Sequence, residues 1–289
     1  MSAQAGIELA RAASRIDGEW LLRVAPLRAR QPCAWTLLEA NGLLGAGSTF
    51  ALGSGGIASV QVEARLAPGS DPGEADERAQ AAIEAAGALL ARLAAGERVT
   101  RAPREEAAEP AAIDLDLPAL VAAAGWPFTA RAAGRLVVPL DLPGGAFLQA
   151  GVEARPNRTV EVAVELARLE PGLPATSREA IAHLLLAASG AVRRARAVAE
   201  EGAGERWAVG FEVVLDVLDA RQGPGELDQA LASLSVAARL CGREVRALMD
   251  ESVAGLYLAA RKGGARPAPA RHRALSRWKP AKEASHALR

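Results

Sequence analysis

Hydrophobic residues recur with two different periods along the chain, and the period changes several times. Val60, Val62 and Ala64 alternate with polar residues, a period of two that predicts a half-buried strand over 57–66. Between residues 74 and 95 the apolar residues are spaced three or four apart, which places them on one face of a helix. The sequence therefore combines strands and helices from its first hundred residues onward.

The rest of the first half is assigned from the same patterns. We predict a short helix over 7–16 and extended segments over 19–24 and 33–39. The segment 40–62 has no charged residue, but its six glycines favour short strands joined by turns over a membrane-spanning helix. Residues 97–113 contain prolines and dense charge without apolar periodicity, which is typical of a linker.

The second half begins in the same way, with a short helix followed by several strands. Thr176 or Ser177 can cap a helix that extends to about residue 200, and Glu179 stands where a capping box needs its carboxylate. The other predicted elements are a helix over 117–124 and strands over 128–132, 136–140, 147–154, 159–166 and 207–218.

A long apolar stripe follows Pro224 and is sustained over three heptads. We expect a helix that covers the protein's own sheet with this stripe. The alternative is an exposed groove or a dimer seam that contacts a partner. The residues that would then make the contact are Leu227, Leu231, Leu234, Val245 and Leu248.

Strands that come in runs, and do not alternate strictly with helices, favour an α+β fold with antiparallel sheets packed against helices. We expect two related units, 1–96 and 114–262, joined by a linker over 97–113. Residues 263–289 contain prolines and glycines without periodicity and are interpreted as a mobile basic tail. The shared order of elements predicts that the two units pack as an internal pseudo-dimer, with a homodimer as the alternative.

Four features of the second half carry a resemblance: Trp126-Pro127-Phe128, the strand over 160–166, the strand over 211–215 and the stripe over 227–248. In this order they resemble the type III secretion chaperone-like fold, shared by secretion chaperones and YbjN-type proteins, over roughly residues 115–260. The resemblance implies a non-enzymatic protein that binds an extended segment of a client. Such chaperones form homodimers, and in this longer chain the dimer would be internal.

Groups with catalytic or metal-binding potential are sparse. His183 lies four residues after Glu179, and we expect a local ion pair there in preference to an acid–base pair. Cys33 and Cys241 belong to no CxxC pair, which favours two free thiols in a reducing cytoplasm. The glycine-rich segment 42–56 lacks the lysine of a phosphate-binding loop. We therefore predict no catalytic site, no cofactor and no metal.

The formal net charge is zero, but the charge is unevenly placed. The tail over 263–289 holds seven basic residues and one acidic residue, so it carries +6 and the remainder of the chain −6. Such a tail can bind phosphates, and its tryptophan can stack on a base. The candidate contacts are Arg271, Arg273, Arg277, Trp278 and Lys279. The leading functional hypothesis is a chaperone-like or adaptor module that binds protein, and the alternative is a nucleic-acid-associated regulator that binds through the tail.

Overall fold

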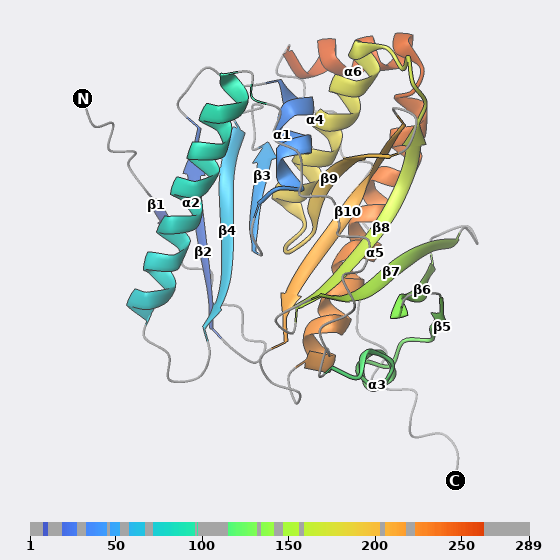
Figure 1. The fold of residues 1–289 in the computed structure, drawn as a ribbon. Helices are drawn as coiled ribbons and strands as arrows, with labels where there is room; N and C mark the ends of the chain where they lie inside the picture. Colours follow the sequence, from blue (N-terminus) through green and yellow to red (C-terminus); the bar gives the residue numbers. More distant parts are fainter. Residues whose placement is uncertain are drawn as a thin grey trace, which may run out of the picture.

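A computed structural model of the chain contains two antiparallel sheets and, within its described residues, six helices (Figure 1). This confirms the predicted α+β class. The structure describes residues 8–10, 19–27, 33–44, 47–52, 58–66, 72–95, 97, 115–131, 134–141, 147–155, 159–202, 206–217 and 223–262. The predicted linker, apart from residue 97, and the basic tail lie outside these ranges, so the predicted domain limits stay predictions.

The first unit is built around a four-stranded sheet with the order β1-β2-β4-β3. Its long helix, α2, packs against β4 and β2, and its short helix, α1, follows β2. The elements are β1 (Glu8–Ala10), β2 (Glu19–Pro26), α1 (Ala34–Asn41), β3 (Ser48–Leu52), β4 (Ala58–Leu66) and α2 (Pro72–Ala94).

The second unit is built around a six-stranded sheet with the order β5-β6-β7-β8-β10-β9. Helix α5 covers β8 and β10, and α6 packs across α4. The elements are α3 (Leu117–Ala123), β5 (Thr129–Ala130), β6 (Leu136–Asp141), β7 (Phe147–Arg155), β8 (Thr159–Leu169), α4 (Ala175–Ala191), β9 (Arg196–Glu201), β10 (Trp207–Asp216), α5 (Gly223–Ala247) and α6 (Glu251–Lys262).

The two units share one topology over most of their length. In the first unit, β1 and β2 are followed by α1, β3, β4 and α2; in the second, β7 and β8 are followed by α4, β9, β10 and α5. The sheet orders correspond as well, because β1-β2-β4-β3 matches β7-β8-β10-β9 strand for strand. The predicted relation between the two halves is therefore visible in the strand order, although no residue-by-residue repeat shows it.

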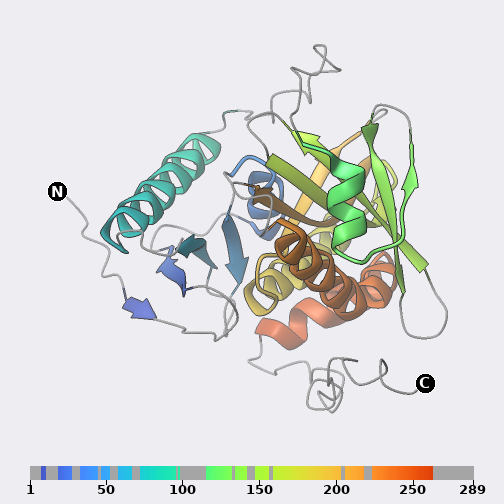
Figure 2. The same cartoon turned by 90° about the horizontal axis from the view of Figure 1, so that it is seen from below.

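The units meet through equivalent elements. Helix α4 contacts β3 of the first unit as well as its own β9, and α1 contacts β9 of the second unit as well as its own β3. The two helices also contact each other and lie next to one another in the middle of the molecule (Figure 2). Reciprocal contacts of this kind are what an isologous, two-fold interface produces. They are the arrangement that the prediction of an internal pseudo-dimer expects.

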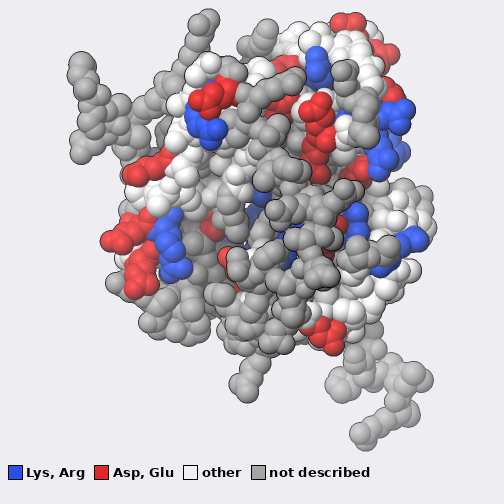
Figure 3. Space-filling view, in the orientation of Figure 1, with Lys and Arg blue, Asp and Glu red and all other residues white. Residues whose placement is uncertain are grey.

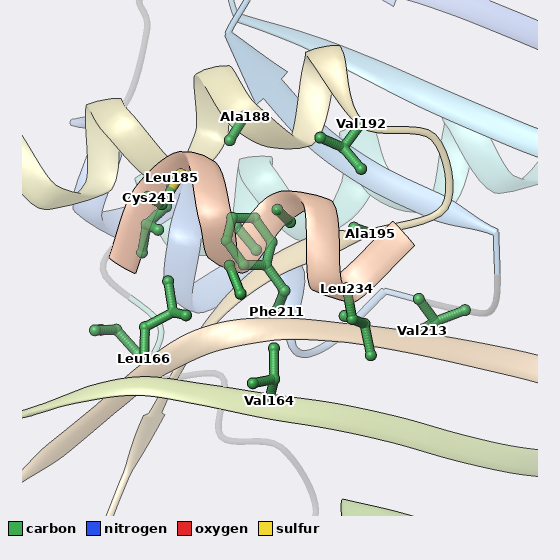
Figure 4. Packing of buried hydrophobic residues seen from close by; sticks show 14 of the residues in the cluster. Val164, Leu166, Leu185, Ala188, Val192, Ala195, Phe211, Val213, Leu234 and Cys241 are labelled. Carbon is green, nitrogen blue, oxygen red and sulfur yellow. The ribbon is translucent and has the colours of Figure 1, made fainter. Parts of the chain in front are cut away.

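The hydrophobic core follows the predicted periods closely. On β8, Val160, Val162, Val164 and Leu166 are buried. Glu165, which lies between Val164 and Leu166, is exposed. The stripe of α5 faces the sheet, and its side chains meet those of β8, β10 and α4, as the close view around Phe211 shows (Figure 4). The expected use of the stripe, to cover the protein's own sheet, is therefore confirmed.

Three predicted elements are wrong. Glu8–Ala10 is not helical but forms β1, because it pairs with the edge of β2. Residues 33–39 are not extended, since 34–41 form α1, whose side chains are buried on several sides between both units and so show no clean period. The helix predicted to reach residue 200 ends at Ala191, where a turn with Arg194 at φ 66° leads into β9.

Candidate functional site

A pocket of about 290 Å³ opens where β8 ends and β10 begins. Its lining residues come from the end of β8, the β8–α4 connection, α4, the end of β9 and the start of β10; these elements meet in the upper right of Figure 1. We refer to it as the junction pocket, because α1 of the first unit lies directly behind its aromatic wall. Its lining residues are Leu169, Glu170, Pro171, Gly172, Leu173, Arg178, Glu201 and Trp207.

The aromatic wall of the junction pocket is Trp207, which is supported from behind by Trp35 of the first unit. Trp207, at the start of β10, is half-buried and packs edge-on against Trp35 of α1, with their ring centroids 5.3 Å apart. The indole Nε1 of Trp35 donates a hydrogen bond to Oε1 of Glu39 at 2.6 Å. Because Trp35 is fixed in this way, the first unit supports the wall of a pocket whose lining belongs to the second unit.

Two of the charged side chains around the junction pocket have no ion-pair partner among the described residues. The guanidinium of Arg178 lies 5.9 Å from the centroid of the Trp35 ring, within the range of a cation–π contact. Glu170 pairs with Arg206 at 3.4 Å. None of the described residues pairs with Arg178 or with Glu201, which is exposed at the pocket. Acidic and basic side chains accordingly gather in the upper right of the space-filling view (Figure 3).

The carboxyl of Glu39, behind the pocket, has a raised pKa, mainly because it is buried. Burial raises the pKa of its carboxyl above the ordinary value of 4.5, and the negative charge of Glu201 raises it further. The hydrogen bond from Trp35 and the positive charge of Arg178 lower the pKa, but they do not offset these two effects. The region behind the pocket is therefore one in which a second negative charge is unfavourable.

Local chain geometry places the lining residues. Gly172 adopts a φ of 88°, which allows the Pro171-Gly172 turn to bring the chain from β8 back to α4. The antiparallel register then sets Trp207 directly opposite Glu201 on β9, so the carboxylate and the indole are cross-strand neighbours. The pairing of Trp207 with Glu201 could not be predicted from the sequence, because residues 196–200 were predicted to be helical and not to form a strand.

A second polar cluster fastens α1 to the second unit. Glu179, on the first turns of α4, accepts hydrogen bonds from the backbone N–H groups of Ala34 (2.8 Å) and Trp35 (3.2 Å). Cys33, the residue before α1, provides no side-chain cap. Glu179 therefore caps a helix of the other unit, and the predicted capping box within its own helix is wrong, because Pro174 occupies the N-cap position.

His183 completes this cluster. Its Nε2 lies 3.5 Å from Oε1 of Glu179, which confirms the predicted local contact between the two side chains. Burial by itself raises the pKa of Glu179, but hydrogen bonds from His183, Ala34 and Trp35 outweigh burial and hold that pKa below its usual value of 4.5. The carboxylate is therefore the stable form when α1 is docked.

Replacing Glu179 by glutamine should lower the free energy of unfolding by about 1 kcal/mol at pH 7, since the amide offers α1 one acceptor oxygen and no charge. The depressed pKa makes this contribution complete above pH 4.5 and removes it as the pH falls through the folded-state value. Urea unfolding of both proteins between pH 7 and pH 3.5 measures the difference, with Glu84→Gln on the exposed face of α2 as the matched control. A difference that stays constant over this range would contradict the assignment.

The deepest part of the junction holds one amide and one ion pair. Asn41, fully buried at the end of α1, donates to the carbonyl oxygens of Phe50 (3.1 Å) and Ala197 (2.9 Å), one in each unit. Arg196 of β9 pairs with Glu212 and also donates to the carbonyl oxygens of the first unit at residues 44 (2.7 Å) and 48 (3.2 Å). Main-chain carbonyls of one unit are thus satisfied by side chains attached to the other.

The residues predicted to contact a partner fall into two groups. The stripe residues of α5 and the following turn are 0–3% exposed, so they contact the protein's own core in this structure; they are Leu227, Leu231, Leu234, Val245 and Leu248. A partner could reach them only if α5 left the sheet. The basic residues of the tail lie outside the described residues; they are Arg271, Arg273, Arg277, Trp278 and Lys279.

Other chemistry finds little support in the part of the chain that the structure describes. No three His, Cys, Asp or Glu side chains there are grouped as metal ligands would be. No helix in the same residues has the length and apolar character to cross a bilayer. Burial raises the pKa of the Cys241 thiol to about 12, so it is protonated at neutral pH, whereas Cys33 is exposed.

Comparison of the chain with family models, curated proteins and solved structures gives no match. The junction pocket therefore rests on its own geometry. Sequence reasoning missed it, although one signal was present: the chain is poor in aromatic residues and has only five tryptophans. One of these, Trp207, lines the pocket, and another, Trp35, packs against it.

Proposed function

We propose that the protein is a non-enzymatic binding module, chaperone-like or adaptor-like, that holds a short segment of a partner protein in the junction pocket. The observation that carries the proposal is that one pocket is lined by a half-buried tryptophan, Trp207, and by an arginine, Arg178, that forms no ion pair with a described residue. Tryptophan and arginine dominate the energetics of protein interfaces. The pocket volume suits one or two side chains of a peptide and not a whole folded surface.

The shared topology of the two units supports the same proposal. The second unit has helix α3, a run of strands, helix α4, further strands and the long helix α5 in chain order, which agrees with the order that carried the resemblance to the type III secretion chaperone-like fold, and the first unit repeats its later part. We propose that the two units form an internal pseudo-dimer in which α1 and α4 occupy equivalent positions. The junction pocket then lies beside the interface between the units, where protein modules often bind ligands.

Site-specific crosslinking tests this function. Trp207 is replaced by the photoreactive p-benzoylphenylalanine, and cells that produce the protein are irradiated. We expect a discrete adduct with another protein from position 207. The matched control carries the same amino acid in place of Glu84, which is exposed on α2 away from the pocket. Equal labelling from positions 207 and 84, or none from 207, would count against the proposed site.

A further inference from the structure

The junction pocket has a charge preference that follows from its lining and the groups behind it. Glu201 and Glu39 contribute two carboxylates, Arg178 contributes one guanidinium, and the remaining acid at the rim, Glu170, is matched by Arg206. When both carboxylates are ionised, the local balance is one negative charge. A cation is the ligand group that restores neutrality.

The two indole rings favour the same kind of group. An indole attracts a cation to its face more strongly than the other aromatic side chains do, at centroid distances up to about 6 Å. Trp35 already carries Arg178 at 5.9 Å, while its partner Trp207 is half-buried at the pocket wall. Glu201 stands opposite Trp207 in the register of β9 and β10. One side of the pocket therefore combines an aromatic ring with an unpaired carboxylate.

We infer that the junction pocket takes a cationic side chain, arginine or lysine, from a segment of the partner protein, with its charge at Glu201 and its apolar stem along Trp207. This inference rests on the proposed function. The aliphatic stem of such a side chain can cover apolar wall residues such as Leu169 and Leu173 while the charged end reaches the carboxylate. Arg178 fixes Trp35 and limits the pocket to a single incoming cation, since it repels a second one.

The environment of Glu39 shows which charges lie near this site. Burial is the largest cause of its raised pKa, Arg178 lowers that pKa, and Glu201 raises it by less than Arg178 lowers it. A cation that enters beside Glu201 adds the missing positive charge on the open side of the cluster. The groups that face Glu39 are then Trp35 on its own helix, Arg178 on α4 and Glu201 on β9, together with the bound side chain.

Three capped tripeptides test the inference: acetyl-Gly-Arg-Gly-amide, acetyl-Gly-Gln-Gly-amide and acetyl-Gly-Glu-Gly-amide. Each is titrated into the full chain while the indole N–H signals are followed by NMR, with the signal of Trp207 assigned from Trp207→Phe. We expect the arginine peptide to shift this signal saturably, and at least about tenfold more tightly than the glutamate peptide, because the pocket carries uncompensated negative charge.

Two variants give effects of opposite sign. Glu201→Gln should weaken binding of the arginine peptide by about three- to tenfold, since one half of the charge pair is lost. Arg178→Gln should raise its affinity by about two- to fivefold, because a like charge is removed. Glu84→Gln, the distant control, should change nothing, and added salt should weaken the wild-type interaction.

The opposite pattern would overturn the inference. If the glutamate peptide binds best and Arg178→Gln abolishes its binding, the pocket is an anion site; if all three peptides shift Trp207 equally or none shifts it, charge does not select the ligand. Crosslinking from position 207 separates these results from failure of the proposed function. If a crosslinked adduct forms in cells but the peptides give any of these results, the proposed protein-binding function stands and only the preference for a cation is wrong.

Discussion

Replacing Arg196 by methionine should lower the free energy of unfolding by about 3–5 kcal/mol, the usual cost of breaking a buried ion pair from one side. The guanidinium Nε lies 3.0 Å from Oε1 of Glu212, and the side chains of Arg196 and Glu212 are 7% and 0% exposed. The methionine would leave the Glu212 carboxylate in the interior without this positive charge. It would also free the carbonyl oxygens of Leu44 and Ser48, which Arg196 binds across the junction.

The double variant Arg196→Met with Glu212→Leu separates these contributions. Because it removes the buried carboxylate together with its partner, we expect it to be more stable than Arg196→Met alone by about 1–2 kcal/mol. Urea unfolding followed by circular dichroism measures four proteins: the wild type, the two single variants Arg196→Met and Glu212→Leu, and the double variant. The ion pair would have no such role if Arg196→Met cost less than about 1 kcal/mol, or if the two single substitutions added without coupling.

Replacing Asn41 by aspartate should destabilise the protein by about 3–5 kcal/mol at neutral pH, because a buried charge replaces a donor and faces two acceptors. In the wild type the amide nitrogen donates to the carbonyls of Phe50 and Ala197, and the amide oxygen accepts from the N–H of Phe50. The carboxyl group of aspartate has the same shape as the amide. Only the N–H donor of the amide is replaced, by an oxygen that accepts hydrogen bonds. The junction would thus be disrupted without a cavity.

A pH series distinguishes charge from lost hydrogen bonds in this experiment. The carboxyl of Asn41→Asp would have a raised folded-state pKa, since burial and the facing carbonyls disfavour its charged form. Its penalty should therefore be full above that pKa and decrease as the pH falls toward the unfolded-state value. The control Asn41→Ala, which carries no charge, should cost about 2–4 kcal/mol with no such pH dependence. If the destabilisation of Asn41→Asp and of Asn41→Ala depends on pH in the same way, the charge that faces the two carbonyls is not the cause of the destabilisation.

The elements that could be predicted from the sequence are those that bury a single face. On β8 the alternation of Val160 and Val162 with polar or small neighbours reflects one sheet face against α5, and the α5 stripe reflects the opposite side of the same contact. Each pattern arises from one packing surface, so the local period carries the information. Their positions in the chain were correctly predicted for this reason.

The elements that could not be predicted are those that both units bury. Helix α1 contacts its own sheet, α4 and β9, so nearly every side of its eight residues is apolar or buried and no period remains. Glu179 suggested a local cap, but its carboxylate serves a helix whose first residue precedes it by 145 positions. The junction pocket depends on the same long-range pairing, because Trp207 meets Trp35 only after the units dock.

The cap that Glu179 provides has a consequence for synthesis of the chain. An isolated helix of eight residues is unstable in water, and α1 has neither a side-chain cap of its own nor an acidic residue in its first turn. The groups that stabilise it, Glu179 and the strand that holds Ala197, leave the ribosome long after Asn41 has emerged. Helix α1 is therefore expected to become stable only after the chain has been translated beyond Ala197, and the apolar residues of the first unit that pack on α1 stay incompletely buried until then.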